Sequence, residues 1–153
     1  MRLIIFDCDG TLVDSQHTIV ERITAAFKGL RYTPPNPGAI RELIGLSLEE
    51  TVQRLLPGSD ALAVDRLVAA YQEQFIEHHR SEGSLEPLFP HADEVLRTLH
   101  SQGYLLGVAT GKSRRGIEAV LEGHKLRIFF STLQTADGHP SKPHPSMLHQ
   151  AMT

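Results

Sequence analysis

Residues 3–11 read LIIFDCDGT, an unbroken apolar run that ends in two acidic residues and a glycine. An apolar run without alternation is typical of a strand that is buried on both faces of a parallel sheet. We therefore expect a strand over residues 2–7, with Asp7 and Asp9 at and just past its carboxyl end. Because open parallel sheets place their ligand crevice at this edge, the two carboxylates are candidate functional groups.

Two more apolar runs predict the rest of a sheet. One covers residues 104–109 between two glycines, and a weaker one covers residues 131–135. Residues 92–99 repeat apolar side chains with helical period before the second run, and Ser113 is placed to cap a helix after it. Strands that alternate with helices predict an α/β fold, here a three-layer, Rossmann-like parallel sheet.

The stretch between the first and second predicted strands has a different pattern, because it contains helical stripes and no convincing strand. One stripe runs over residues 19–30 and another over residues 64–75, and a capping box at 47–50 opens a short helix between them. Residues 34–38, Pro-Pro-Asn-Pro-Gly, interrupt this helical region. We therefore expect an α-helical cap over residues 16–82, inserted into a core of residues 1–15 and 83–153.

Composition and charge exclude several classes of function. The chain of 153 residues has 15 Lys and Arg against 18 Asp and Glu, a formal net charge of −3 with no basic run, so nucleic acid is not expected as a partner. No apolar stretch approaches the roughly 18 residues of a membrane span, and the acidic N-terminal segment is unlike a secretory signal. With a single cysteine, Cys8, these features predict a cytoplasmic protein without membrane association.

The ends of the three predicted strands carry the candidate chemistry. Asp7 and Asp9 suit a divalent hard cation and a division into a nucleophile and an acid/base, although an Asp-Gly pair also occurs in simple turns. Thr110 and Gly111 offer a hydroxyl and a backbone N–H to an anion, and Lys142 supplies a cation after the third strand. Because parallel strands bring these ends to one edge, the set predicts a phosphoryl-transfer site.

Three segments at these strand ends resemble the first three motifs of the haloacid dehalogenase-like hydrolase superfamily. They are DCDGTLVDS at residues 7–15, GVATGK at 107–112 and SKPHP at 141–145. The second acidic residue, Asp9, resembles that of the phosphatases and phosphomutases, since the dehalogenases lack it. The order of elements resembles phosphoglycolate phosphatase-like members with a helical cap. This resemblance implies Mg²⁺-dependent hydrolysis of a small phosphate monoester, a phosphorylated metabolite similar to phosphoglycolate.

The resemblance also implies a role for each matched residue. Asp7 attacks phosphorus and becomes an aspartyl phosphate, while Asp9 protonates the leaving alcohol and later activates water. Mg²⁺ is held by the Asp7 carboxylate and the Asp9 backbone carbonyl. Phosphoryl oxygens are held by Thr110 and Gly111, and Lys142 balances the negative charge of Asp7 and the substrate phosphate.

One part of the family's pattern has no match in this chain. The fourth motif, a Gly-Asp pair with a further acidic residue after another strand, supplies the remaining metal carboxylate, and the sequence ends at Thr153 without it. We therefore expect the C-terminal strands of the core to be missing, as in a fragment or the product of a shortened reading frame. The first strand then lies at a sheet edge, where self-association is expected.

Two alternatives to the phosphatase stay open. A phosphomutase of the same family would keep the phosphoryl group on the substrate, and a truncated, non-catalytic remnant would act as an interaction module through its open sheet edge. The sequence does not specify the substrate either, because the residues of the cap that would contact a leaving group are scattered. The candidates are Arg22, Arg31, Tyr32, Arg41 and the turn at Gly45.

Overall fold

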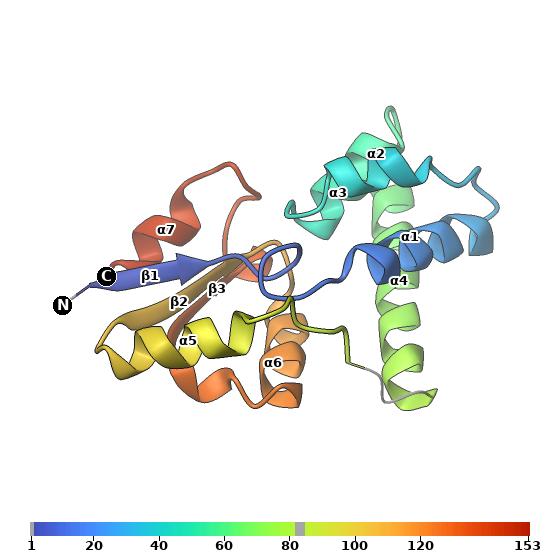
Figure 1. Ribbon diagram of the computed structural model, residues 1–153. Coiled ribbons are helices and arrows are strands. Elements are labelled where there is room, and N and C mark those ends of the chain that lie inside the picture. The colour runs from blue at the N-terminus through green and yellow to red at the C-terminus, as the bar shows by residue number, and fades with distance from the viewer. Residues whose placement is uncertain (1, 82–84) are drawn as a thin grey trace. The chain divides into compact units, whose positions relative to one another are not determined.

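A parallel sheet of three strands forms the centre of the α/β part of the chain, in the order β1-β2-β3 (Figure 1). The strands are β1 (Leu3–Phe6), β2 (Leu105–Thr110) and β3 (Phe130–Thr135), and Leu3 is aligned with Leu105. They are seen in a computed structural model, which describes residues 2–81 and 85–153. The three predicted strands are confirmed, with ends shifted by a single residue.

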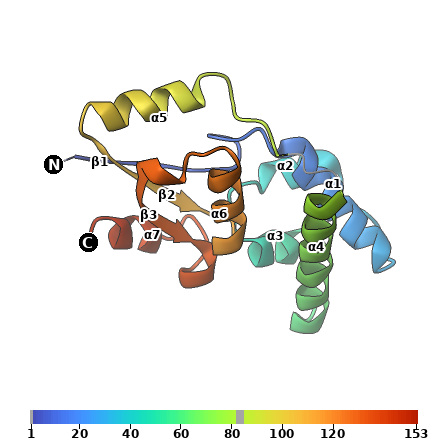
Figure 2. The same ribbon diagram turned by 90° about the horizontal axis from the view of Figure 1, so that it is seen from below.

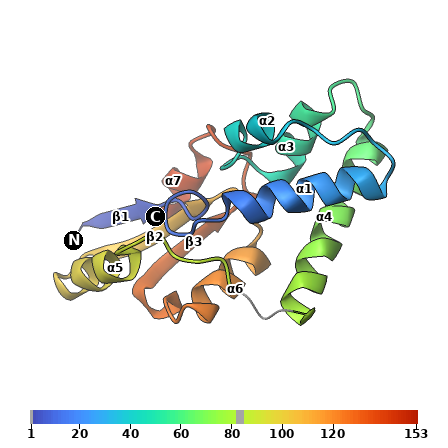
Figure 3. The ribbon, with the colours of Figure 1, turned by 45° about the vertical axis from the view of Figure 1, so that its right-hand side comes forward.

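Helices cover both faces of the sheet, which gives the three layers predicted for the fold. α5 (Ala92–Ser101) and α6 (Arg114–Gly123) lie on one face, and α7 (Ser146–Ala151) lies on the other (Figure 1, Figure 3). Two short 3₁₀ turns, η1 (Arg127–Phe129) and η2 (Ala136–Gly138), flank β3. The shared buried core consists of Cys8, Leu12, Val13, Leu96, Leu106, Val108, Ile117, Val120, Leu121, Leu126, Phe129, Phe130 and Leu133.

Local sequence signals account for the helix ends beside the sheet. Ser113 Oγ accepts a hydrogen bond from the backbone N–H of Gly116 at 3.2 Å, so Ser113 caps α6 as predicted. After α5, Gly103 has a φ of 83°, a left-handed conformation that glycine adopts at little cost and that ends the helix. These two ends fix where β2 begins and where the loop at its carboxyl end turns into α6.

The helical part of the chain contains α1 (Gln16–Gly29), α2 (Pro37–Glu42), α3 (Leu48–Leu55) and α4 (Ala61–Ser81). α1 packs against α4 (Figure 2), and apolar residues of both helices belong to one buried core. The helices expected from the apolar stripes are confirmed. The side chains at their centre form a second buried core, made of Val20, Ile23, Ala26, Phe27, Ile40, Val52, Val64 and Leu67.

α2 is a helix that the sequence pattern did not predict. Residues 34–38 predict an interruption, yet α2 begins inside them, at Pro37. The Asn36 side chain accepts a hydrogen bond from the Gly38 N–H at 2.7 Å, and Pro37 takes the first helical position, where the missing N–H removes no helical hydrogen bond. The Asn-Pro pair therefore starts a helix as well as ending a loop.

The described residues fall into two compact units, each with its own core. The sheet unit contains Met1–Asp14, Gly45–Ser47 and Glu86–Thr153, and the helical unit contains Ser15–Ile44 and Leu48–Leu85. The predicted cap boundary at 82/83 lies outside the described residues. Across residues 2–81 and 85–153, none of the helices has the length and apolar character needed to span a bilayer.

Candidate active site

Asp7 lies directly after β1, and two polar groups hold its carboxylate. Its Oδ1 accepts a hydrogen bond from the Cys8 N–H at 2.7 Å, and its Oδ2 lies 2.7 Å from the Lys142 Nζ. Lys142 follows β3, so the ion pair joins the ends of two strands that are not neighbours in the sheet. The side chains of Asp7 and Lys142 are 30% and 27% exposed, which leaves both within reach of solvent.

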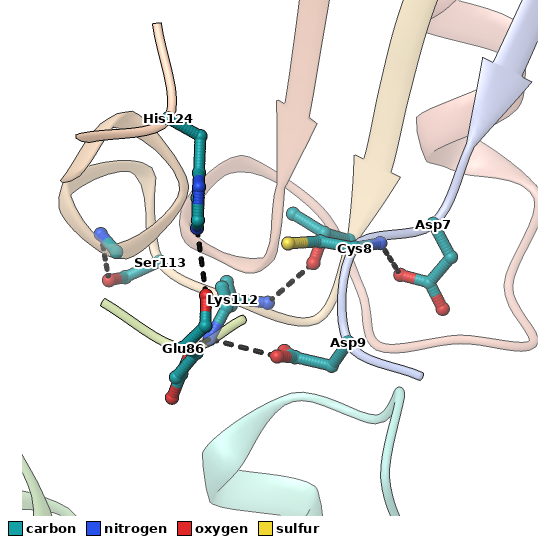
Figure 4. Close-up of polar contacts among 9 residues, drawn as sticks. Asp7, Cys8, Asp9, Glu86, Lys112, Ser113 and His124 are labelled. Atoms are coloured by element: carbon teal, nitrogen blue, oxygen red, sulfur yellow. Dashed lines mark hydrogen bonds and ion pairs between the residues drawn. The ribbon is translucent and has the colours of Figure 1, made fainter. Parts of the chain in front are cut away.

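Asp9, two residues further on, pairs with a different lysine. Its Oδ1 lies 2.9 Å from the Lys112 Nζ, and the two side chains are 10% and 11% exposed. Figure 4 shows the Asp7 and Asp9 carboxylates on opposite sides of the loop. Each negative charge therefore has its own cation, and the two carboxylates occupy different surroundings. Different surroundings are what allow two carboxylates to take different catalytic roles.

A tight turn after Asp9 fixes the backbone that carries both carboxylates. Gly10 has a φ of 77°, and its N–H donates to the Val13 carbonyl at 3.0 Å. The Cys8 carbonyl accepts hydrogen bonds from the N–H groups of Leu12 at 2.8 Å and Val13 at 3.1 Å. Because glycine reaches a positive φ without steric cost, the Asp-Gly pair makes the turn and also presents the acidic residues at the sheet edge.

Thr110 and Gly111, at the end of β2, have structural partners at the same sheet edge. Thr110 is fully buried, and its Oγ1 accepts a hydrogen bond from the Lys112 N–H at 3.2 Å. A Cβ atom at Gly111 would overlap the Leu46 carbonyl group and lie 2.6 Å from the Gly45 carbonyl oxygen. Close backbone approach therefore requires glycine at position 111, in addition to the anion contact predicted for its N–H.

Residues 45–47 include the turn at Gly45, which the sequence suggested as a leaving-group contact, but their contacts with the sheet unit were not predicted. The Ser47 N–H donates to the Ser141 Oγ at 2.9 Å, across a sequence separation of 94 residues. A Cβ atom at Gly45 would lie 3.6 Å from the Asp7 Oδ2. These contacts bring the segment against the first and third motif loops. A pairing over this separation leaves no local signal in the sequence, because neither segment shows the periodicity of a helix or strand.

Cys8 is a buried member of the sheet core, although it stands between the two acidic residues. Burial, assisted by the negative charge of Asp9, raises the pKa of the Cys8 thiol well above its ordinary value of 9.0, while Lys112 acts against the shift. The thiol therefore stays protonated at physiological pH. Since the thiolate is the reactive form, Cys8 is not a nucleophile in this site.

The residues that the sequence suggested as leaving-group contacts are placed in different surroundings. Arg22 is buried in the helical unit, and its guanidinium carbon lies 4.9 Å from the centre of the Phe75 ring. Gly45 belongs to the sheet unit. The candidates in the helical unit whose side chains are partly or fully exposed are Arg31, Tyr32 and Arg41.

The donors available to a metal ion at this edge are few. Asp7 has a carboxylate and Asp9 a backbone carbonyl, but the part of the chain that the structure describes contains no group of three or more His, Cys, Asp and Glu side chains able to hold an ion. Mg²⁺ commonly takes one or two carboxylates and fills its other positions with water and substrate phosphate. The two donors therefore fit Mg²⁺ as a partial site that a phosphate group would complete.

Comparison with known proteins assigns a family to this fold and site. Residues 4–153 match the family described as haloacid dehalogenase-like hydrolase, a range that includes all three motif loops. The chain belongs to this family. As a haloacid dehalogenase-like hydrolase it has the parallel sheet, the helices on both faces and the acidic loop after β1 that the first motif predicted.

Two relatives and one solved structure show how far the similarity extends. The protein named "Probable phosphatase IndB" of Dickeya dadantii is 38% identical over 99% of this chain and 66% of its own length. A phosphoglycolate phosphatase of Pseudomonas fluorescens is 32% identical over 99% of this chain and 57% of its own length. The crystal structure of a haloacid dehalogenase-like hydrolase from Bacteroides fragilis has a TM-score of 0.87 at 26% identity, covering 98% of this chain and 70% of that protein. This chain thus spans less than two thirds of the two relatives' lengths.

Proposed function

We propose that the chain is a Mg²⁺-dependent phosphatase that hydrolyses a small phosphate monoester through an aspartyl phosphate on Asp7. The observation that carries the proposal is the Asp7–Lys142 ion pair across the sheet edge, two residues from an Asp9 that has a separate and less exposed cation, Lys112. This arrangement offers a nucleophile, a charge-balancing cation and an acid/base on rigid strand ends.

In the first half-reaction, a carboxylate oxygen of Asp7 attacks phosphorus, and the bond between phosphorus and the leaving oxygen breaks. Protonated Asp9 gives its proton to that oxygen, so the product departs as an alcohol. Lys142 balances the charge of Asp7 and the phosphoryl group. Thr110 and the Gly111 N–H would hold phosphoryl oxygens from the end of β2.

In the second half-reaction, the Asp9 carboxylate takes a proton from water while the water oxygen attacks phosphorus. The bond between phosphorus and Asp7 breaks, which releases inorganic phosphate and restores the Asp7 carboxylate. Asp9 is protonated again and ready for the next substrate. The sum of the two halves is a phosphate monoester plus water giving an alcohol plus phosphate.

The Asp7 carboxylate and the Asp9 backbone carbonyl are the groups that would hold Mg²⁺, as judged from the donors at the sheet edge. When bound, the ion supplies charge neutralisation on the transferring phosphoryl group. The Asp7 carboxylate would then be shared with Lys142, which already contacts its Oδ2 at 2.7 Å. With the ion bound, the charge of the Asp7 carboxylate would be balanced from two sides, by Lys142 and by the metal.

The substrate class that we propose is a small phosphorylated carboxylic acid such as 2-phosphoglycolate. Support comes from a relative named phosphoglycolate phosphatase that is 32% identical over 99% of this chain. A compact substrate also agrees with a site whose residues all belong to the sheet unit, which includes the short segment at residues 45–47.

The test is phosphate release by the purified chain from a panel of phosphorylated metabolites that includes 2-phosphoglycolate, with and without Mg²⁺. We expect release that requires Mg²⁺ and disappears in Asp7→Asn. Asp65→Asn, the same substitution at an exposed position on α4, should leave the rate unchanged. No release from any monoester, or equal release by Asp7→Asn, would contradict the proposal, and transfer of phosphate between positions of a sugar without release would indicate a phosphomutase.

A further inference from the structure

Lys112 is a largely enclosed lysine that neither the sequence pattern nor the reaction scheme explains. It follows the Thr110-Gly111 pair after β2, and its Nζ lies 2.9 Å from the Asp9 Oδ1 and 3.8 Å from the Glu86 Oε2. The side chains of Lys112 and Glu86 are 11% and 8% exposed. One ammonium group is therefore within ion-pair distance of both carboxylates, and Figure 4 shows its contact with Asp9.

The three charged groups come from three different segments, each anchored by its own backbone contacts. Lys112 is held at the β2 turn because its N–H donates to the Thr110 Oγ1 at 3.2 Å. Glu86 is held because its carbonyl oxygen lies 2.7 Å from the His124 Nε2 at the end of α6. Asp9 is held by the turn at Gly10. The ammonium of Lys112 is therefore fixed before any substrate arrives.

Burial makes the direction of the Asp9 carboxylate depend on this ammonium. A buried carboxylate is stable only when it is paired, and a charge-assisted hydrogen bond is strongly directional. Lys112 attracts Asp9 toward the end of β2, whereas Glu86, if it stood there without the lysine, would repel it. Lys112 thus favours the side of the loop on which the Asp9 carboxylate lies.

We propose that Lys112 is a positioning residue for Asp9 and that Glu86 keeps Lys112 in place. The catalytic part of this inference rests on the proposed phosphatase function, in which Asp9 transfers the proton. The pairing itself does not rest on that function. Without Lys112, the Asp9 carboxylate loses the ion pair that fixes its starting position for proton transfer.

The consequence differs between leaving groups, and this difference separates positioning from a general structural role. An alkoxide is a poor leaving group and needs the proton from Asp9, whereas p-nitrophenolate departs without one. The ratio kcat/KM includes steps only up to departure of the leaving group. Loss of positioning therefore lowers kcat/KM for alkyl phosphates and spares p-nitrophenyl phosphate, while a distorted site lowers both.

The kinetic experiment compares wild type, Lys112→Met, Lys112→Arg and the control Lys28→Met, which makes the same change at an exposed residue of α1. For Lys112→Met we expect kcat/KM for 2-phosphoglycolate to fall at least about tenfold more than kcat/KM for p-nitrophenyl phosphate. A general acid typically contributes about a hundredfold or more, and loss of positioning should remove part of that contribution. Lys112→Arg should recover most of the kcat/KM for 2-phosphoglycolate that Lys112→Met loses. Lys28→Met should change kcat/KM for neither substrate. Equal losses on both substrates would overturn the proposal.

A second measurement tests the ion pair between Lys112 and Asp9 directly. It needs neither enzymatic activity nor a substitution of Lys112. In the chain labelled with ¹⁵N-lysine, we expect Asp9→Asn to shift the side-chain NMR signal of Lys112 and Asp7→Asn to shift that of Lys142. A Lys112 signal that does not respond to Asp9→Asn would overturn the proposal even if the enzyme is active. If wild type hydrolyses no monoester, the phosphatase proposal fails, and this NMR comparison alone decides whether Lys112 holds Asp9.

Discussion

The two aspartates of the first motif pair with lysines from different loops, Asp7 with Lys142 and Asp9 with Lys112. The two carboxylates therefore differ in their neighbours and in their exposure. Lys142 contacts an Asp7 that is 30% exposed, so this carboxylate is accessible to solvent. Lys112 contacts an Asp9 that is 10% exposed, and the same ammonium group also pairs with Glu86. A more exposed carboxylate suits the nucleophile, and a more enclosed one suits the group that exchanges a proton.

Lys142 should matter for catalysis more than for folding, because its side chain is only partly buried. Lys142→Met should lower kcat/KM for every monoester by about a hundredfold, the usual effect of removing one charge-stabilising group from a site. Lys142→Arg should recover part of the rate. Steady-state kinetics with Lys125→Met, an exposed lysine of the same unit, as control will check this. A loss below twofold would exclude Lys142 from the site.

Cys8 should be inert in the folded chain. Its raised thiol pKa and complete burial predict no reaction with a thiol reagent at pH 8 and complete reaction after unfolding in urea. Because the folded-state pKa lies above the ordinary value of 9.0, the thiol contributes no pH dependence below that value, and stability falls as the pH rises above it. Rapid labelling of the native chain would show that the Cys8 region opens.

The sequence could identify Asp7, Asp9 and Lys142 as candidates because each follows an apolar run that predicts a strand. The topology of a parallel sheet then brings strand ends together without further information. Lys112 and Glu86 could not be identified in the same way. A lysine after a Thr-Gly turn is usually solvated, and its burial here depends on a glutamate 26 residues away in the chain.

At the scale of elements, helix and strand positions followed closely from local chemistry. The start of α6 depends on one serine side chain and the end of α5 on one glycine, so both could be read from single residues. α2 was missed because proline-rich segments suggest loops, although the Asn36-Pro37 pair carries a helix-start signal. The packing of residues 45–47 against the β2 loop could not be foreseen, since it depends on three-dimensional contacts alone.

Gly111 tests the contact between the β2 loop and residues 45–47. Gly111→Ala places a Cβ against two carbonyl groups, so it should lower the free energy of unfolding by about 1–3 kcal/mol and reduce turnover. Gly29→Ala, at the end of α1 with nothing within 4 Å of its Cβ position, should raise it by up to about 1 kcal/mol. Urea denaturation of both variants is the measurement. Equal stability of the two would contradict the close contact.

At the scale of the whole molecule, the two units have separate buried cores, one around the sheet and one between α1 and α4. A change confined to one core should therefore weaken that unit first. Leu67→Ala, at a fully buried position in the helical unit, should lower local stability there by about 3 kcal/mol. Native-state hydrogen exchange should show faster exchange in α1, α3 and α4, with β1, β2 and β3 little changed. Equal loss in both units would mean that they unfold together.

If Asp7 is the nucleophile, a covalent phosphoryl group forms on its carboxylate during turnover and can be trapped. The chain is mixed with Mg²⁺ and p-nitrophenyl phosphate, quenched in acid within its first turnovers, digested and analysed by mass spectrometry. We predict one phosphoryl group on the peptide that contains Asp7, absent in Asp7→Asn and accumulated in Asp9→Asn, because water is no longer activated in that variant. Phosphate release by wild type with no label on this peptide, or an equal label in Asp7→Asn, would contradict the account.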